Sequence, residues 1–191
     1  MILGPYRGAL SVTLAGLILL LIGNLGAFGP LSFLPGASTA LFSGLLSRNM
    51  KASASVIFIV VVALFAFYPN SGPAWSFPYF LWLHIVAFIV LLSIQLLNRV
   101  DLHSSTHRDL MISVASLSFT STMFGHLVGS LMFEALFNSN FSQEGWGFLW
   151  QSISLVYPYE RAIITIFSTL LGFPIIKILN SQKVELINFK S

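Results

Sequence analysis

Long apolar runs separated by short polar links dominate the pattern of this chain. A helix needs roughly 20 apolar residues to cross a bilayer, and fewer when neighbouring helices shield it. The pattern therefore predicts an all-α integral membrane protein, a single domain that folds as a six-helix transmembrane bundle. The six runs lie at about 8–26, 37–47, 52–68, 79–97, 110–137 and 158–180.

The second run is too short to cross a bilayer alone. It follows GNLGAFGPLSFLPG, residues 23–36, a stretch with four glycines and two prolines. Irregular backbone at membrane depth is tolerated only where protein buries it or where it lines a cavity. We therefore expect a short second helix after a Gly/Pro-rich outer loop. The sequence leaves open whether residues 27–36 re-enter the membrane.

The basic residues predict the orientation of the helices. With the N-terminus inside, six spans place eight of the nine Lys and Arg residues on the cytoplasmic side and only Arg161 outside. By the positive-inside rule we expect both termini in the cytoplasm, in a multi-pass protein of the cell membrane. The eight residues are Arg7, Arg48, Lys51, Arg99, Arg108, Lys177, Lys183 and Lys190.

Composition supports the membrane assignment and limits the chemistry. Of the 191 residues 56% are hydrophobic and 8% are charged, whereas a typical soluble domain carries about 25% charged residues. The absence of cysteine excludes disulfides and thiolate sites. The basic residues are scattered, so we expect no nucleic-acid partner. No phosphate-binding loop or nucleophile elbow appears, so we expect neither an enzyme nor an ATPase, and no cofactor.

The links on the two sides of the predicted bundle differ in composition. Those at 47–52 and 98–109 are short and charged, whereas the outer links at 69–78 and 138–157 contain aromatic residues, amides, Gly and Pro. Outer loops of this kind often hold a ligand or act as lids. The alternative is ordinary packing of aromatic side chains at the interface, where Trp and Tyr are enriched. The four tryptophans all lie at or near the predicted outer interface: Trp75, Trp82, Trp146 and Trp150.

The segment FGHLVGSLMFEALF, residues 124–137, places polar residues inside the fifth run. Residues four apart share a helix face, so a polar row climbs toward the outer surface. Beside it a small-xxx-small pattern lets another helix approach closely. Ionisable groups within a membrane are costly and mark functional-site candidates, so this face is expected to contact protein or water rather than lipid. The row is Ser118, Thr122, His126, Ser130 and Glu134, and the packing positions are Ser121, Gly125 and Gly129.

Further polar groups fall in the same outer half of the predicted bundle. Glu160 and Arg161 follow Pro158, a residue that suits a helix start. Asn24 lies near the outer end of the first helix, and His84 lies a short way into the fourth. The structural alternative to a binding role is an ion pair between Glu134 and Arg161 that caps the bundle.

Two histidine pairs raise the question of a metal or haem. His84 and His126 lie on different predicted helices and offer axial ligands for a haem, but no supporting motif accompanies them. His103 and His107 have the i, i+4 spacing of a metal pair. They lie in a short polar link without cysteine or a third ligand, which favours solvated loop residues. We therefore expect no metal site.

Three segments carry a family resemblance: GAFGPLSFLPGASTALFSGLL (26–46), FGHLVGSLMFEALF (124–137) and YPYERAIITIFSTLLGFPIIKIL (157–179). They resemble, in order, the first outer loop with the short second helix, the glycine-bearing fifth helix and the proline-containing sixth helix of one class of transporter subunit. This class is the substrate-binding S components of energy-coupling-factor (ECF) vitamin and metal transporters. The resemblance implies a six-helix membrane protein that binds its ligand in a pocket near the outer surface.

The resemblance also implies binding and relocation of a solute rather than catalysis. A membrane coupling subunit and two ATPases would drive release of a vitamin-like or metal solute into the cell. Two acids, Glu134 and Glu160, and one base, Arg161, favour a cationic or hydrogen-bond-donating solute. The alternative is a non-catalytic structural or assembly subunit of a larger membrane protein complex. The expected substrate-binding residues are His126, Glu134, Ser130, Glu160, Arg161 and Asn24, with Trp75 or Trp150 stacking on the solute.

Overall fold

The computed structural model describes residues 2–24, 26–48, 50–97, 101–102, 104 and 106–188, with side chains up to residue 182. Over this part of the chain the regular elements are all helices, without a strand. The prediction of an all-α protein is therefore confirmed. Arg99, His103, Lys190 and the side chain of Lys183 lie outside the described residues, so the predictions made for them stay predictions.

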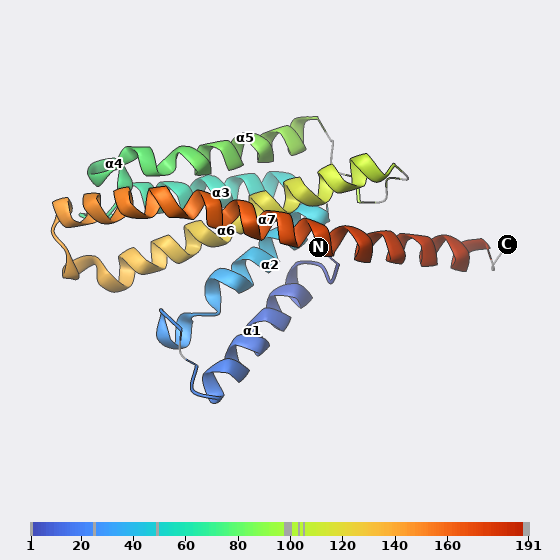
Figure 1. Cartoon of the computed structure of the whole chain (residues 1–191), viewed down its shortest axis with the longest axis horizontal. Helices are drawn as coiled ribbons and strands as arrows, with labels where there is room; N and C mark the ends of the chain where they lie inside the picture. The colour runs from blue at the N-terminus through green and yellow to red at the C-terminus, as the bar shows by residue number, and fades with distance from the viewer. Residues whose placement is uncertain are drawn as a thin grey trace.

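Six helical segments run back and forth along one main direction (Figure 1). Because they alternate in direction, the N-terminus, the α2–α3 turn and the α5–α6 connection share one end, here called the N-terminal end. The α3–α4 and α6–α7 turns lie at the opposite end, here called the far end. The six segments are α1 (Pro5–Leu21), α2 (Leu34–Ser47), α3 (Lys51–Ala66), α5 (Trp82–Leu96), α6 (His107–Phe137) and α7 (Gln143–Asn188). Between them lie α4 (Pro73–Ser76) and the 3₁₀ turns η1 (Gly29–Leu31), η2 (Pro78–Leu81) and η3 (Asn138–Asn140).

Among the described residues, three helices are long and apolar enough to cross a membrane. They are Pro78–Leu96, His107–Asn140 and Gln143–Gln182. Pro5–Leu21 and Lys51–Ala66 are apolar but shorter. The chain therefore has the helices of a membrane protein, while six crossings and their orientation stay predictions.

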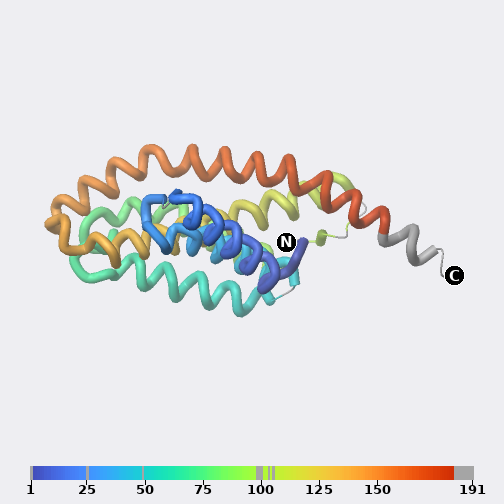
Figure 2. The backbone as a smooth tube through the Cα atoms, turned by 90° about the horizontal axis from the view of Figure 1, so that it is seen from below, coloured from blue at the N-terminus to red at the C-terminus, as the bar shows by residue number. Residues whose placement is uncertain are grey.

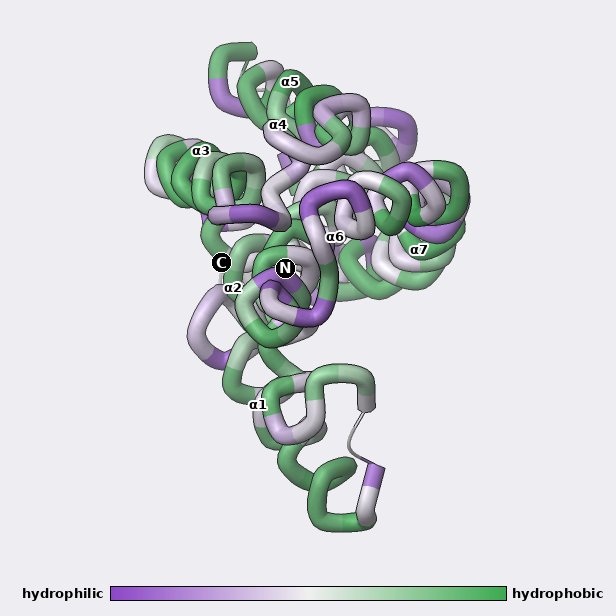
Figure 3. The backbone as a smooth tube through the Cα atoms, turned by 90° about the vertical axis from the view of Figure 1, so that its left-hand side faces the viewer, coloured by the Kyte–Doolittle hydropathy of each residue, from purple (hydrophilic) through white to green (hydrophobic). Residues whose placement is uncertain are grey.

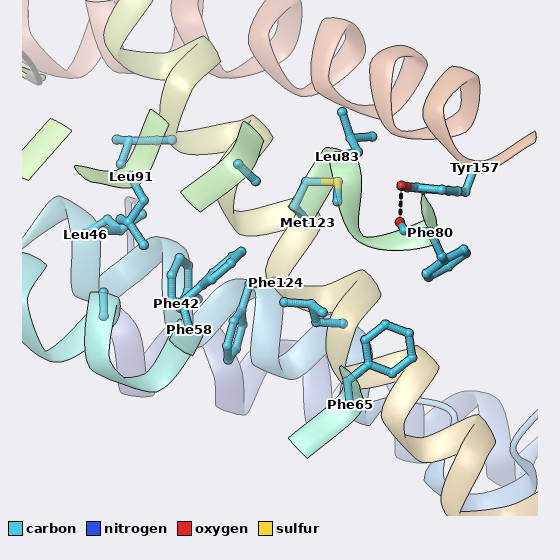
Figure 4. Close-up of a cluster of buried hydrophobic side chains, with 14 of the residues drawn as sticks. Phe42, Leu46, Phe58, Phe65, Phe80, Leu83, Leu91, Met123, Phe124 and Tyr157 are labelled. Carbon is cyan, nitrogen blue, oxygen red and sulfur yellow. Dashed lines mark hydrogen bonds between the residues drawn. The ribbon is translucent and has the colours of Figure 1, made fainter. Parts of the chain in front are cut away.

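Helix α6 lies at the centre of the bundle and packs against α2, α3, α5 and α7. Helix α1 packs chiefly against α2 and stands apart from the other helices (Figure 3). The core beside α6 is aromatic: Phe42 of α2 stacks on Phe124 with ring centroids 4.2 Å apart, and Phe58 of α3 lies 5.9 Å from Phe42. These rings lie together in Figure 4. The core thus ties α2 and α3 to the middle of α6.

The small residues of α6 face α2. A Cβ atom at Gly125 would collide with Thr39 Oγ1 and would lie 2.9 Å from the Pro35 carbonyl oxygen. At Gly129 the nearest atom to an added Cβ is Pro35 Cγ, at 3.5 Å. Ser121, one turn before Gly125, is buried. Of the two glycines, Gly125 therefore lies closer to the backbone of α2.

The prediction that residues 138–157 form a connection is wrong for residues 143–157, because only residues 138–142 link α6 to α7. Helix α7 begins at Gln143 and continues through Pro158 and Pro174 (Figure 2). Pro158 thus lies inside the helix and not at its start. Proline is tolerated inside membrane helices because neighbouring helices and side chains satisfy the backbone groups that it leaves unpaired.

The first turns of α7 form because one of their faces packs on the bundle. Residues at 3- and 4-residue spacing share a helix face. Four such residues are buried or half-buried, and three of them, Trp146, Trp150 and Tyr157, are at most 1% exposed. The four are Trp146, Trp150, Ile153 and Tyr157. These two tryptophans are therefore core residues of the far end, whereas Trp75 and Trp82 are half-exposed.

Candidate functional site

A cavity of about 540 Å³ lies beside His126 and is bounded by α1, α2, α6 and α7. Four of the predicted binding residues line it: His126, Ser130, Trp150 and Arg161. Helix α1 contributes Val12, and α2 contributes Thr39. The volume is typical of pockets that hold small molecules. The cavity is therefore the candidate functional site.

The side chains of His84 and His126 contact each other directly. His84 Nε2 lies 3.2 Å from His126 Nδ1, and the two ring planes differ by 9°. A neutral imidazole has one donor and one acceptor nitrogen, so one ring donates to the other. Rings in direct contact leave no room for a haem between them. The pair instead joins α5 to α6 beside the cavity.

An aromatic platform fixes the orientation of His126. Tyr157 stacks on the His126 ring with centroids 4.9 Å apart. The Tyr157 hydroxyl donates a hydrogen bond of 2.9 Å to the Phe80 carbonyl oxygen (Figure 4). The Phe80 ring, fully buried, lies 4.8 Å from that of Trp150 and 5.7 Å from that of His84. His126 Nδ1 bonds to His84, so Nε2 remains for a group in the cavity.

Phe80 and Tyr157 are site residues that sequence reasoning missed. Tyr157 ends the segment that was predicted to be a loop. Phe80 lies near the start of the apolar run 79–97, in which no pattern distinguishes one aromatic residue from the next. The available signal was the helical spacing of Trp146, Trp150 and Tyr157. Such a stripe predicts one buried helix face.

Arg161 forms an ion pair with its neighbour Glu160. Its Nη2 lies 2.6 Å from Glu160 Oε1, and the two side chains are 15% and 54% exposed, respectively. Arg161 Nε is buried and has no hydrogen-bond partner. Glu160 therefore contacts only Nη2 of the guanidinium and does not line the cavity.

Glu134 lies away from the cavity lining, although it belongs to the same polar row as His126. Its side chain is fully buried, and neither carboxyl oxygen has a hydrogen-bond partner. The ion pair considered between Glu134 and Arg161 is therefore absent. Ser118, Thr122 and Ser130 of the row are also buried. The row faces protein along its length, but only its middle part reaches the cavity.

The remaining predicted residues lie elsewhere. Trp75 is 55% exposed, and its ring packs on that of Phe67 at 5.6 Å. Asn24 is exposed and lines an adjoining cavity of about 290 Å³ between α1 and the Gly/Pro-rich stretch, which shares Val12 and Gly36 with the larger one. Trp75, Asn24, Glu134 and Glu160 thus do not join the four residues at the 540 Å³ cavity.

Replacing Glu134 by methionine is expected to stabilise the protein. A buried polar group without a partner costs free energy in either protonation state, and an apolar side chain of similar size removes that cost. We expect Glu134→Met to raise the free energy of unfolding by about 1 to 3 kcal/mol. Glu144→Met, at an exposed position of α7, serves as the control and is expected to change little. Thermal unfolding in detergent measures both, and a loss of stability in Glu134→Met contradicts the expectation.

Comparison with known proteins gives one distant relative. No protein-family model matches the chain, and no solved structure matches it. A segment of 133 residues is 27% identical to an uncharacterized protein of Methanocaldococcus jannaschii. The match covers 69% of this chain and 44% of that protein, so the chain spans less than half the length of this relative. The name of that protein states no activity.

Proposed function

We propose that the chain is the membrane-embedded, substrate-binding subunit of a small-molecule uptake transporter. The observation that carries the proposal is the cavity of about 540 Å³, at which His126, Ser130, Trp150 and Arg161 come together. A cavity with an apolar wall and a few convergent polar groups is the usual form of a small-molecule site. The resemblance of three segments to ECF S components supports the same function. A vitamin-like molecule fits such a cavity in size.

We infer six crossings, with the N-terminal end of the bundle in the cytoplasm. The alternating directions of the six segments support this arrangement (Figure 1). Arg7 near the chain start, Arg48 and Lys51 at the α2–α3 turn, and Arg108 at the start of α6 belong to this end. Cationic residues favour the cytoplasmic side. Helix α2 has 14 residues, about 21 Å, so it crosses only together with the Gly/Pro-rich stretch before it.

The energy for transport would come from partner subunits. Helices α1 and α7 present apolar side chains outward, such as Leu14 and Leu17 on α1 and Leu170 on α7. In this proposal a membrane coupling subunit covers part of these faces, the bilayer covers the rest, and ATPases bind to the coupling subunit. A structural or assembly subunit of a larger complex would present the same faces, and the experiment below separates the two functions.

Filling the cavity is expected to abolish ligand binding. Val12 lines the cavity from α1, whereas Leu14 on the same helix is 51% exposed and does not line it. We expect native mass spectrometry of the detergent-solubilised protein, against a panel of vitamins and metal ions, to find a ligand on the wild type and on Leu14→Trp. Val12→Trp should bind it at least about tenfold more weakly, a loss of about 1.4 kcal/mol.

Two results would contradict the proposed binding of a solute in the 540 Å³ cavity. If none of the three forms gains a ligand and the wild type purifies in fixed stoichiometry with a large membrane complex, the structural subunit is the better explanation. Equal binding by Val12→Trp and the wild type would place the solute elsewhere.

A further inference from the structure

Among the residues that the structure describes, Arg161 is the one permanently charged side chain in the lining of the 540 Å³ cavity. No aspartate or glutamate whose side chain the structure describes lines it, because Glu134 is buried elsewhere and Glu160, 54% exposed, lies outside the lining. The charged groups of the cavity therefore differ from those expected from the sequence, which were two acids and one base. Its charge favours an anionic ligand over a cationic one.

The guanidinium of Arg161 has donors that no protein group uses. An arginine carries five N–H donors, and Glu160 contacts Nη2 alone while itself being 54% exposed. Arg161 Nε is buried without a partner. Buried N–H groups without an acceptor are rare in folded proteins, so a ligand acceptor is the natural partner. The planar fork of a guanidinium matches the two oxygens of a carboxylate.

The rest of the lining suits a flat and mostly apolar body. Phe28, Phe133 and Trp150 line the cavity. Trp150 is only 1% exposed, and its indole N–H donates to the Ser71 carbonyl oxygen at 2.7 Å, so the accessible aromatic surface comes from Phe28 and Phe133, which are half-buried. Aromatic rings of a ligand pack well on such surfaces. His126 adds one polar contact through the nitrogen that His84 does not occupy.

We propose that the cavity binds a small carboxylate-bearing molecule, whose carboxylate meets the Arg161 guanidinium and whose flat apolar body lies against Phe28 and Phe133. This inference rests on the proposed function, because it names the class of solute for the same site. It reverses the preference for a cationic solute that the sequence suggested. Arg161 selects the charge of the solute, and the aromatic residues of the lining select its shape.

Matched pairs of acids and amides test the solute class in the full-length, detergent-solubilised protein. The probes are nicotinate with nicotinamide, indole-3-acetate with indole-3-acetamide, and biotin with its amide, measured by native mass spectrometry and calorimetry at pH 7. We expect at least one acid to bind about tenfold or more tightly than its amide, as loss of a charge-assisted hydrogen bond implies.

Two variants locate the effect. Arg161→Gln should lose the preference for the acid, whereas Lys177→Gln should keep it, since Lys177 is an exposed cation of the same helix outside the cavity. Amides that bind as tightly as their acids to the wild type, or an acid preference that survives in Arg161→Gln, overturn the solute class. In either case binding that Val12→Trp still abolishes leaves the proposed function standing. Absence of binding by every probe and every member of the vitamin and metal panel overturns both.

Discussion

Replacing Gly125 by alanine is expected to destabilise the protein by about 2 kcal/mol or more, a cost typical of overpacking in a close-packed interior. The same substitution at Gly129, one turn later, is expected to leave stability unchanged or to raise it slightly. Both positions lie in α6 and both face α2. The two variants therefore add the same methyl group to the same interface.

The difference follows from what each new methyl group meets. At Gly125 it would collide with Thr39 Oγ1 and would lie 2.9 Å from the Pro35 carbonyl oxygen. Rotation of the Thr39 side chain relieves the first contact but breaks its hydrogen bond to the Pro35 carbonyl, at 2.8 Å. The second contact is to backbone, so relief requires α2 to move away. At Gly129 the nearest atom, Pro35 Cγ, lies at an ordinary contact distance of 3.5 Å.

Helix propensity works in favour of alanine at both positions, by roughly 1 kcal/mol over glycine in a helix interior. The collision at Gly125 exceeds this gain, whereas nothing opposes it at Gly129. Thermal unfolding in detergent of the wild type, Gly125→Ala and Gly129→Ala measures the three stabilities side by side. Equal stability of the two variants would contradict the close approach of α2 and α6 at Gly125.

The runs of apolar residues and the positions of small residues allowed most of the fold to be predicted from the sequence. Runs of apolar residues predict helices because a helix in a membrane must satisfy its own backbone, and the described residues are indeed helical. The start of α7 was missed because residues 138–157 combine aromatic residues, Gly and amides in the manner of a loop. The spacing of Trp146 and Trp150 contradicts that composition. Their burial shows that spacing was the better guide here.

The candidate site shows why a row of polar residues on one helix is not enough to predict which residues line a binding pocket. Successive residues on a helix turn by about 100°, so a row at intervals of four drifts by about 40° per step. From His126 to Glu134 the drift is about 80°, enough to turn Glu134 toward other neighbours. Contacts between distant segments, such as that of His84 with His126 at 3.2 Å, depend on the packing of whole helices. No local pattern encodes them.

Replacing Phe80 by alanine is expected to cost about 3 kcal/mol of stability, the usual range for removal of a buried aromatic ring. Phe80 is fully buried in η2, and its ring lies within 6.0 Å, centroid to centroid, of five others. The rings belong to Phe65, His84, His126, Trp150 and Tyr157. The neighbours come from α3, α5, α6 and α7, so the space left by the ring cannot close by the shift of one helix.

The adjacent Tyr79 provides the matched control, because it is also an aromatic residue of η2 but is 79% exposed. Tyr79→Ala is expected to change the free energy of unfolding by no more than about 0.5 kcal/mol. Phe80→Ala should also weaken binding of the acid probe, since His126 and Trp150 both pack on the lost ring and both line the cavity. Thermal unfolding and calorimetry on the same preparations measure both effects. If Phe80→Ala unfolds at the same temperature as the wild type but binds no ligand, the Phe80 ring positions the site without stabilising the fold. If Phe80→Ala keeps both stability and binding, the Phe80 ring has neither role.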